Sequence, residues 1–125
     1  MQLLRARFAA YSTGHVDYIV STTHADNSQL KGSSSFREDV KATCDSFVFS
    51  HLQVLREEGT PDPHVKLVTF RYECAVASKR GFGGKAADKR TVEETSVFVL
   101  LASAGGRWVF FDSKEALAGK LIAPS

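Results

Sequence analysis

The sequence has 125 residues and a formal net charge of +2; 43% of its residues are hydrophobic and 24% are charged. A chain of this length can bury a core as one domain without help from disulfides or metal ions. The composition argues against disorder and against a transmembrane segment, because the sequence has neither a low-complexity tract nor a long apolar run.

The beginning of the chain carries the pattern of an amphipathic helix. Leu4, Phe8 and Tyr11 recur at helical spacing before Gly14 interrupts the pattern, so a helix is predicted over residues 3–13. The segment lacks the uninterrupted apolar run and the cleavage site of a secretory leader. We therefore expect a soluble, intracellular protein, with the compartment left open.

Two further helices are predicted before the strands begin. A short helix over residues 15–24 follows from a stripe of apolar side chains that ends before a polar run. Ser35 and Glu38 have the spacing of a capping box, in which each side chain bonds a free backbone N–H, and apolar residues follow at helical spacing. This pattern predicts a third helix over residues 35–48.

After the third helix, apolar residues recur at every second position, which is the pattern of β-strands. Gly105 and Gly106 form the turn signal of a hairpin between the last two of these strands. Helices followed by an antiparallel meander indicate an α+β fold rather than alternating β-α-β units. The predicted strands span residues 50–57, 65–79, 91–103 and 106–112. Alternation places on one face of its strand each of three sets: Phe70 and Tyr72; Glu94, Ser96 and Phe98; and Trp108, Phe110 and Asp112.

Four stretches of the sequence, in the same order, resemble the YchJ-like family. They are Arg5-Ala6-Arg7-Phe8-Ala9-Ala10-Tyr11, Val16-Asp17-Tyr18 followed by His24, Glu94-x-Ser96-x-Phe98, and Gly106-Arg107-Trp108-Val109-Phe110-Phe111-Asp112. The resemblance implies a nuclear transport factor 2-like cone, in which three N-terminal helices pack on a curved four-stranded antiparallel sheet. It implies a domain over residues 1–113 with a C-terminal extension over residues 114–125, and it implies no particular activity.

The sequence also departs from this family. Thr23, Glu93 and Ser113 stand where relatives have a tryptophan, a histidine and a glycine. Relatives often carry a cysteine-rich, zinc-binding SEC-C segment beside the domain, and this sequence shows none. Cys44 and Cys74 lack the spacing of metal ligands, so we interpret them as reduced core residues and expect no metal site and no cofactor.

In a cone of this kind, ligands enter between the helices and the concave face of the sheet, so polar residues directed inward are the candidates for a site. Arg7 shares a helix face with Leu4 and Tyr11, and we expect it to meet a buried carboxylate such as Glu94 or Asp112. This pattern favours a structural ion-pair network over a working acid–base site. The candidate pocket residues are Arg7, Tyr11, His24, Glu94, Trp108 and Asp112.

The connection between the second and third strands is strongly basic. Between residues 79 and 90, five basic residues stand against one acidic residue, Asp88. We expect this loop to project from the hairpin, to be poorly ordered without a partner, and to contact an acidic protein, an anionic surface or a nucleic-acid backbone. The alternative is a solvated hairpin tip. The candidate contact residues are Lys79, Arg80, Phe82, Lys85, Lys89 and Arg90.

Two hypotheses of function follow from these observations. The first is a non-catalytic ligand-binding or protein-interaction module that acts as a homodimer or as a subunit of a larger assembly, with the basic loop as its contact element. The alternative is a small enzyme of the isomerase, dehydratase or hydrolase kind that uses polar residues in the cone. This alternative rests on analogy with the fold alone.

Overall fold

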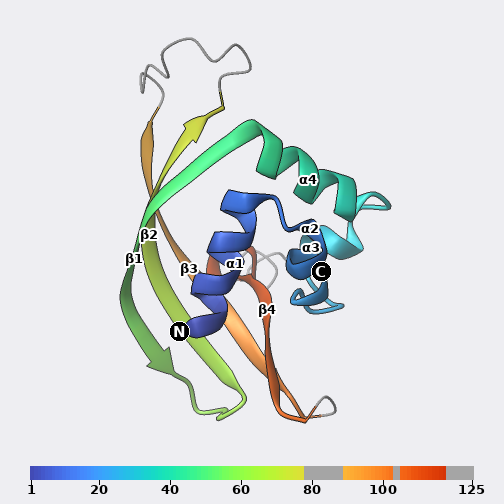
Figure 1. Ribbon diagram of the computed structural model, residues 1–125. Coiled ribbons are helices and arrows are strands. Elements are labelled where there is room, and N and C mark those ends of the chain that lie inside the picture. The colour runs from blue at the N-terminus through green and yellow to red at the C-terminus, as the bar shows by residue number, and fades with distance from the viewer. Residues whose placement is uncertain (78–88, 103–104, 118–125) are drawn as a thin grey trace.

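The computed structural model describes residues 1–77, 89–102 and 105–117. It is an α+β structure in which one antiparallel sheet, in the order β1-β2-β3-β4, curves around helix α1 (Figure 1). This architecture confirms the predicted fold class. The elements are α1 (Gln2–Thr13), α2 (Val16–Ser21), α3 (Ser28–Lys31), α4 (Phe36–Ser46), β1 (Phe47–Gly59), β2 (Val65–Val76), β3 (Arg90–Leu101) and β4 (Arg107–Ser113).

The region after α1 differs from the prediction. The second helix ends at Ser21 instead of residue 24, because Thr22 and Thr23 leave the helix and pair with the edge of β4 through a bridge between Thr23 and Phe110. A single helical turn, α3, follows and was not predicted. The side chain of Asn27 caps this turn by accepting a hydrogen bond from the N–H of Leu30 (3.0 Å).

The predicted capping box at the start of α4 is wrong in its details. Ser35 occupies the N-cap position, but its side chain makes no capping hydrogen bond. Ser33 acts nearby instead, since its Oγ donates to Asp39 Oδ2 (2.7 Å) and accepts from the N–H of Ser35 (3.1 Å). The helix ends two residues earlier than predicted, because Phe47 adopts an extended conformation and begins β1 directly.

The first strand is longer and less regular than predicted. Its pairing with β2 shifts between Ser50 and Gln53 and again between Val54 and Arg56, so each interruption adds one residue to β1. His51, in the first interruption, has a positive φ of 57°, a conformation that is uncommon for residues other than glycine. Such bulges bend a strand and increase its twist. They allow β1 to curve around α1 (Figure 1).

The other three strands are antiparallel neighbours, as predicted, with limits that differ by a few residues. The predicted end of the second strand, residues 78 and 79, lies outside the described residues, and so does residue 103. Residues 114–117 form a short helical turn that was not predicted, and Ser113 Oγ accepts a hydrogen bond from the N–H of Ala116 (3.1 Å). The division of the chain at residue 113 stays a prediction.

Two apolar clusters hold α1 in place. One is formed by Leu4 of α1 with Val68, Phe70 and Phe98 of the sheet, and the other joins α1, α2 and α4 through Ala10, Ile19 and Val40. Fully burying a side chain such as Phe98 contributes roughly 1.5–3 kcal/mol. Because one cluster lies toward each end of α1, the middle of the helix faces the sheet across a hollow.

Most of the basic loop, residues 78–88, lies outside the described residues, so its predicted projection and disorder stay predictions. Its last two basic residues are described. Lys89 Nζ lies 3.1 Å from Glu73 Oε1 of the neighbouring strand, and Arg90 begins β3. Within residues 1–77, 89–102 and 105–117, the structure has no helix with the length and apolar character needed to span a bilayer.

Candidate ligand-binding cavity

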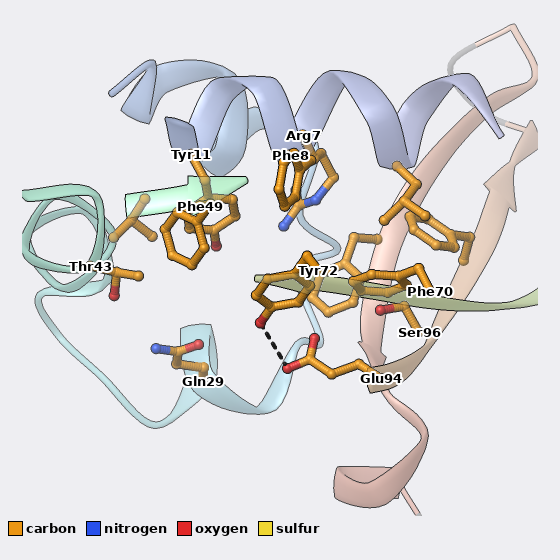
Figure 2. Close-up of a pocket in the computed structure, with 14 residues that line it drawn as sticks. Arg7, Phe8, Tyr11, Gln29, Thr43, Phe49, Phe70, Tyr72, Glu94 and Ser96 are labelled. Carbon is orange, nitrogen blue, oxygen red and sulfur yellow. Dashed lines mark hydrogen bonds between the residues drawn. The ribbon is translucent and has the colours of Figure 1, made fainter. Parts of the chain in front are cut away.

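A cavity of about 300 Å³ lies between the helices and the concave face of the sheet (Figure 2). Its volume is at the lower end of the roughly 300–1,000 Å³ that is usual for small-molecule sites. The wall is mainly apolar, with a few polar groups from three helices and the sheet. The lining residues are Leu4, Arg7, Phe8, Tyr11, Gln29, Val40, Thr43, Phe49, Phe70, Tyr72, Glu94, Ser96, Phe98 and Phe110.

Aromatic rings form one side of the cavity. The ring of Tyr72 packs edge to face against Phe8 (5.7 Å between centroids) and against Phe49 (5.9 Å). Phe49 makes the same kind of contact with Tyr11 (5.9 Å). Edge-to-face pairs at these distances are favourable and fix the orientation of the rings. The cavity therefore offers a preformed surface for an apolar or aromatic group.

Arg7 points inward, as predicted, and only 6% of it is exposed. Its Nη1 donates to the carbonyl oxygen of Ile19 (3.0 Å) and to the hydroxyls of Thr22 (2.7 Å) and Thr23 (3.1 Å). The two hydroxyls can accept because they donate their own protons to carbonyl groups at the end of α2. Arg7 thus fixes the end of α2 against α1.

The expected partner of Arg7 was a carboxylate, and this expectation was wrong. Among the described residues, no Asp or Glu lies within ion-pair distance of Arg7; helix-end carbonyls and hydroxyls take that role. Carbonyl groups at a helix C-terminus carry partial negative charge and stabilise a cation. The guanidinium also lies over the ring of Phe110, with 4.7 Å from Cζ to the centroid. Burial lowers the pKa of Arg7, and the group remains charged.

Tyr72 and Glu94 form a polar pair in the cavity, and Glu94 is exposed at its open side. The hydroxyl of Tyr72 donates to Glu94 Oε1 over 3.3 Å (Figure 2). Desolvation raises the pKa of Glu94, and the hydrogen bond from Tyr72 opposes that shift. Desolvation and the negative charge of Glu94 together raise the pKa of Tyr72 well above its ordinary value.

Asp112 is buried but does not line the cavity, in contrast to the prediction. Its Oδ2 accepts from the N–H of Ser28 (3.0 Å), and its Oδ1 accepts from the N–H of Ser113 (2.9 Å). The predicted alternation fails because the pairing of β3 with β4 shifts between Phe110 and Asp112, leaving Phe111 as an extra residue. A bulge of this kind moves the residue beyond it to the other face of the sheet.

His24 and Trp108 also lie outside the cavity lining. His24 Nδ1 accepts from the N–H of Asp26 (2.9 Å), and its ring packs edge-on against Phe111. Trp108 packs against the core cluster and carries the ammonium group of Lys66 over its ring (5.1 Å to the centroid). Of the six predicted pocket residues, the structure brings Arg7, Tyr11 and Glu94 together around one cavity.

Sequence reasoning missed the polar residues Gln29, Thr43 and Tyr72 as members of the site. Alternation placed Tyr72 on the same strand face as Phe70, and that signal could have identified it. Gln29 belongs to α3, the turn that was not predicted, so no sequence signal indicated it. Within the described ranges, no three His, Cys, Asp or Glu side chains gather closely enough to hold a metal ion.

The sequence matches the family described as YchJ, middle NTF2-like domain, over residues 1–113. The chain belongs to this family. No curated protein is significantly similar to the chain.

Solved structures show the same fold. A SEC-C motif containing protein from Rhodopseudomonas palustris has a TM-score of 0.67 and 22% identity, over 90% of this chain and 74% of its own. One from Psychrobacter arcticus has a TM-score of 0.64 and 19% identity, over 88% of this chain and 56% of its own. A proposed polyketide cyclase from Xanthomonas campestris has a TM-score of 0.53 and 12% identity, over 88% and 87%. At these identities the likeness shows the fold and leaves the activity open.

Proposed function

We propose that this YchJ-like domain is a non-catalytic module that binds a small molecule with an apolar or aromatic body. The observation that supports this function is the cavity of about 300 Å³, open to solvent and lined by seven aromatic side chains together with a few polar groups. An open cavity lined by rings that pack against one another lowers the cost of ordering the site when a ligand enters.

Two of the predicted pocket residues already form hydrogen bonds within the protein, and this favours binding over catalysis. Arg7 and Asp112 are held by backbone and hydroxyl partners in the described part of the chain, and their removal would damage the fold. His24 lies outside the cavity lining. His24, the histidine among the predicted pocket residues, is therefore not positioned to act on a ligand in the cavity.

A cavity-filling substitution tests this function. Ser96 is buried in the cavity wall on β3, so Ser96→Phe should place a ring in the ligand space. Thr91→Phe is the matched control, because it adds the same ring to an exposed position on the opposite face of β3. The measurement is the saturable fluorescence of 1-aminoanthracene, a neutral apolar probe, with circular dichroism to check the fold.

We expect the wild-type domain and Thr91→Phe to bind the probe equally, and Ser96→Phe to bind it at least about tenfold more weakly, since the added ring occupies apolar contact area. Probe binding that Ser96→Phe leaves unchanged would show that the cavity is not the site. The absence of saturable binding of 1-aminoanthracene to the wild type would contradict the proposed ligand-binding function.

A small enzyme remains the second candidate, because Tyr72 and Glu94 form a hydrogen-bonded acid–base pair in the cavity. A carboxylate with a raised pKa is suited to removing a proton from an activated carbon. Exchange of the acidic C–H protons of phenylacetone in D2O, followed by NMR, distinguishes the two functions. Exchange above the buffer rate that Glu94→Gln abolishes supports an enzyme, and exchange at the buffer rate supports a binding module.

We further propose that residues 79–90 contact an acidic partner when the domain acts as a homodimer or as a subunit of an assembly. The proposal rests on the positive charge of this segment. Replacing Lys79, Arg80, Lys85, Lys89 and Arg90 with serine should weaken partner capture from a lysate. We expect the thermal midpoint to stay nearly unchanged, because the exposed ion pair of Lys89 with Glu73 contributes little to stability. Capture by the substituted protein at the wild-type level would contradict the proposal.

A further inference from the structure

Arg7 uses only one of its three guanidinium nitrogens in the described structure. Its Nη1 makes the contacts with Ile19, Thr22 and Thr23, whereas none of the described residues accepts a hydrogen bond from Nε or Nη2. Arg7 lines the cavity although only 6% of it is exposed, and its guanidinium end points toward the hollow in Figure 2. The edge formed by Nε and Nη2 is therefore the available donor surface of a buried cation.

The charge of Arg7 is only partly compensated by its neighbours. Burying a cation is costly unless it is paired with a negative charge and its hydrogen bonds are satisfied. The described residues supply carbonyl and hydroxyl oxygens but no carboxylate. A planar carboxylate matches the fork of two N–H donors that a guanidinium presents, and such charge-assisted pairs are among the strongest hydrogen bonds in proteins.

Tyr11 adds a second donor beside Arg7. It lies one turn further along the same face of α1 and also lines the cavity. Its hydroxyl makes no hydrogen bond with any other described residue, and burial raises its pKa, so the hydroxyl keeps its proton. The ring of Phe110 covers one face of the Arg7 guanidinium, which leaves an edge-on approach from the cavity.

We propose that Arg7 and Tyr11 bind the carboxylate of a monocarboxylic ligand whose apolar body fills the aromatic cavity. This inference rests on the proposed ligand-binding function and names the chemical class of the ligand. A single carboxylate fits better than two, because a second one near the open side of the cavity would face Glu94. Like charges at close range are destabilising.

The experiment compares two probes that differ in charge and have the same length, 4-phenylbutanoate and 4-phenylbutanamide. Affinities are measured at pH 7 by titration calorimetry, and the side-chain Nε–Hε resonance of Arg7 is followed by NMR. We expect the wild-type domain to bind the carboxylate at least about tenfold more tightly than the amide, because a charged acceptor strengthens each hydrogen bond. The Arg7 resonance should shift with the carboxylate and remain in place with the amide.

Substitutions test whether Arg7 and Tyr11 cause the preference for the carboxylate probe. Arg7→Met should reduce the ratio of the two affinities to about one, and Tyr11→Phe should reduce it in part, since each removes donors from the carboxylate. Arg5→Met is the matched control, because Arg5 is exposed on the same helix, and it should keep the full ratio at modest ionic strength. If Arg7→Met does not fold, the wild-type ratio and the Arg7 resonance still decide the matter.

Equal affinities for the two probes, or binding of neither probe, would overturn this inference. A carboxylate preference that persists in folded Arg7→Met would overturn it as well. The proposed function would fail separately, through loss of 1-aminoanthracene binding to the wild type. A domain that binds 1-aminoanthracene in a way that Ser96→Phe abolishes, yet does not discriminate between the two probes, keeps its cavity and loses the carboxylate site.

Discussion

Two polar regions of this domain are built in opposite ways. The first, here called the edge junction, is formed by residues 22–28 where they pair with residues 110–112 of β4. Its N–H groups and carbonyls are joined by hydrogen bonds of 2.8 Å between His24 and Phe110 and between Phe110 and Thr22. The second, here called the mouth, is formed by Gln29, Tyr72 and Glu94 at the open side of the cavity.

The difference shows why an ionisable residue in a fold is not by itself a site. Asp112 in the edge junction is 5% exposed, and each of its carboxylate oxygens accepts a backbone N–H, so it has a structural role. Glu94 at the mouth is exposed and has one long hydrogen bond, so its carboxylate is free to meet a ligand. Arg7 belongs to the edge junction through the contacts of Nη1 with Thr22 and Thr23, and it also lines the cavity.

Truncating Arg7 should break the edge junction and give the largest loss of stability. Arg7→Ala removes a buried side chain together with three hydrogen bonds, so we expect the free energy of unfolding in urea to fall by about 2–4 kcal/mol. Arg7→Met should lose less, because its side chain retains much of the packing. Arg5→Ala, on the exposed face of α1, should change stability by less than about 0.5 kcal/mol. A loss below 1 kcal/mol for Arg7→Ala would contradict a structural role.

Removing Asn27 should weaken the junction by a smaller amount. The residue is 3% exposed; its Nδ2 donates to the carbonyl oxygen of Phe111 (2.8 Å) and its Oδ1 caps α3. We expect Asn27→Ala to lower the free energy of unfolding by about 1–2 kcal/mol, the usual cost of a lost cap and an unpaired carbonyl. The control is Asp26→Ala, which removes an exposed neighbour and should have almost no effect. Equal losses in the two variants would show that the cap is not responsible.

Substitutions at the mouth should leave stability nearly unchanged, in contrast to those in the junction. Tyr72→Phe and Glu94→Gln remove one long hydrogen bond at an open surface, so we expect changes within about 0.5 kcal/mol in urea unfolding. The same two substitutions should alter ligand affinity or proton exchange if the mouth has a functional role. A loss above about 1.5 kcal/mol would place the mouth among the structural regions.

The smallest expected effect is a change in the pKa of Glu94, which tests the hydrogen bond between Tyr72 and Glu94. Its pKa should lie above the ordinary range of a glutamate, and Tyr72→Phe should raise it further, because the hydroxyl of Tyr72 stabilises the ionised form. The measurement is a 13C NMR titration of the side-chain carboxyl carbon of Glu94 in the wild type and in Tyr72→Phe. A pKa that falls in Tyr72→Phe would contradict the assigned direction of the hydrogen bond.

The sign of the linked effect on stability follows from the same shift. A folded-state pKa above the unfolded value means that the folded domain holds the proton more tightly than the unfolded chain. The contribution of Glu94 to stability is therefore fully present below its unfolded pKa and is lost as the pH rises through its folded pKa. Solvent at the mouth makes this contribution small. Glu94→Gln should remove the contribution of Glu94 to the pH dependence of stability and leave the contributions of the other groups unchanged.

The sequence alone determined the fold class and the order of the elements apart from α3 and the turn at residues 114–117. Periodicity identified α1, α4 and all four strands, and it placed Phe70, Tyr72, Glu94, Ser96 and Phe98 on the strand faces that line the cavity. This worked because β2 and β3 pair without a bulge, so alternation alone fixes the face of each of these side chains. It also placed Arg7 and Tyr11 on one face of α1.

Only the tertiary structure decided the partners of these residues. Arg7 was expected to meet a carboxylate, but the end of α2 lies against α1 and offers carbonyls and hydroxyls that satisfy Nη1. Asp112 was expected in the cavity, but the bulge at Phe111 turns it to the other face. Both outcomes depend on segments far apart in the sequence, and one extra residue in a strand reverses the face of those beyond it. Local periodicity indicates neither the partners of a buried residue nor the position of a bulge. Only the folded structure therefore decided which polar groups line the cavity.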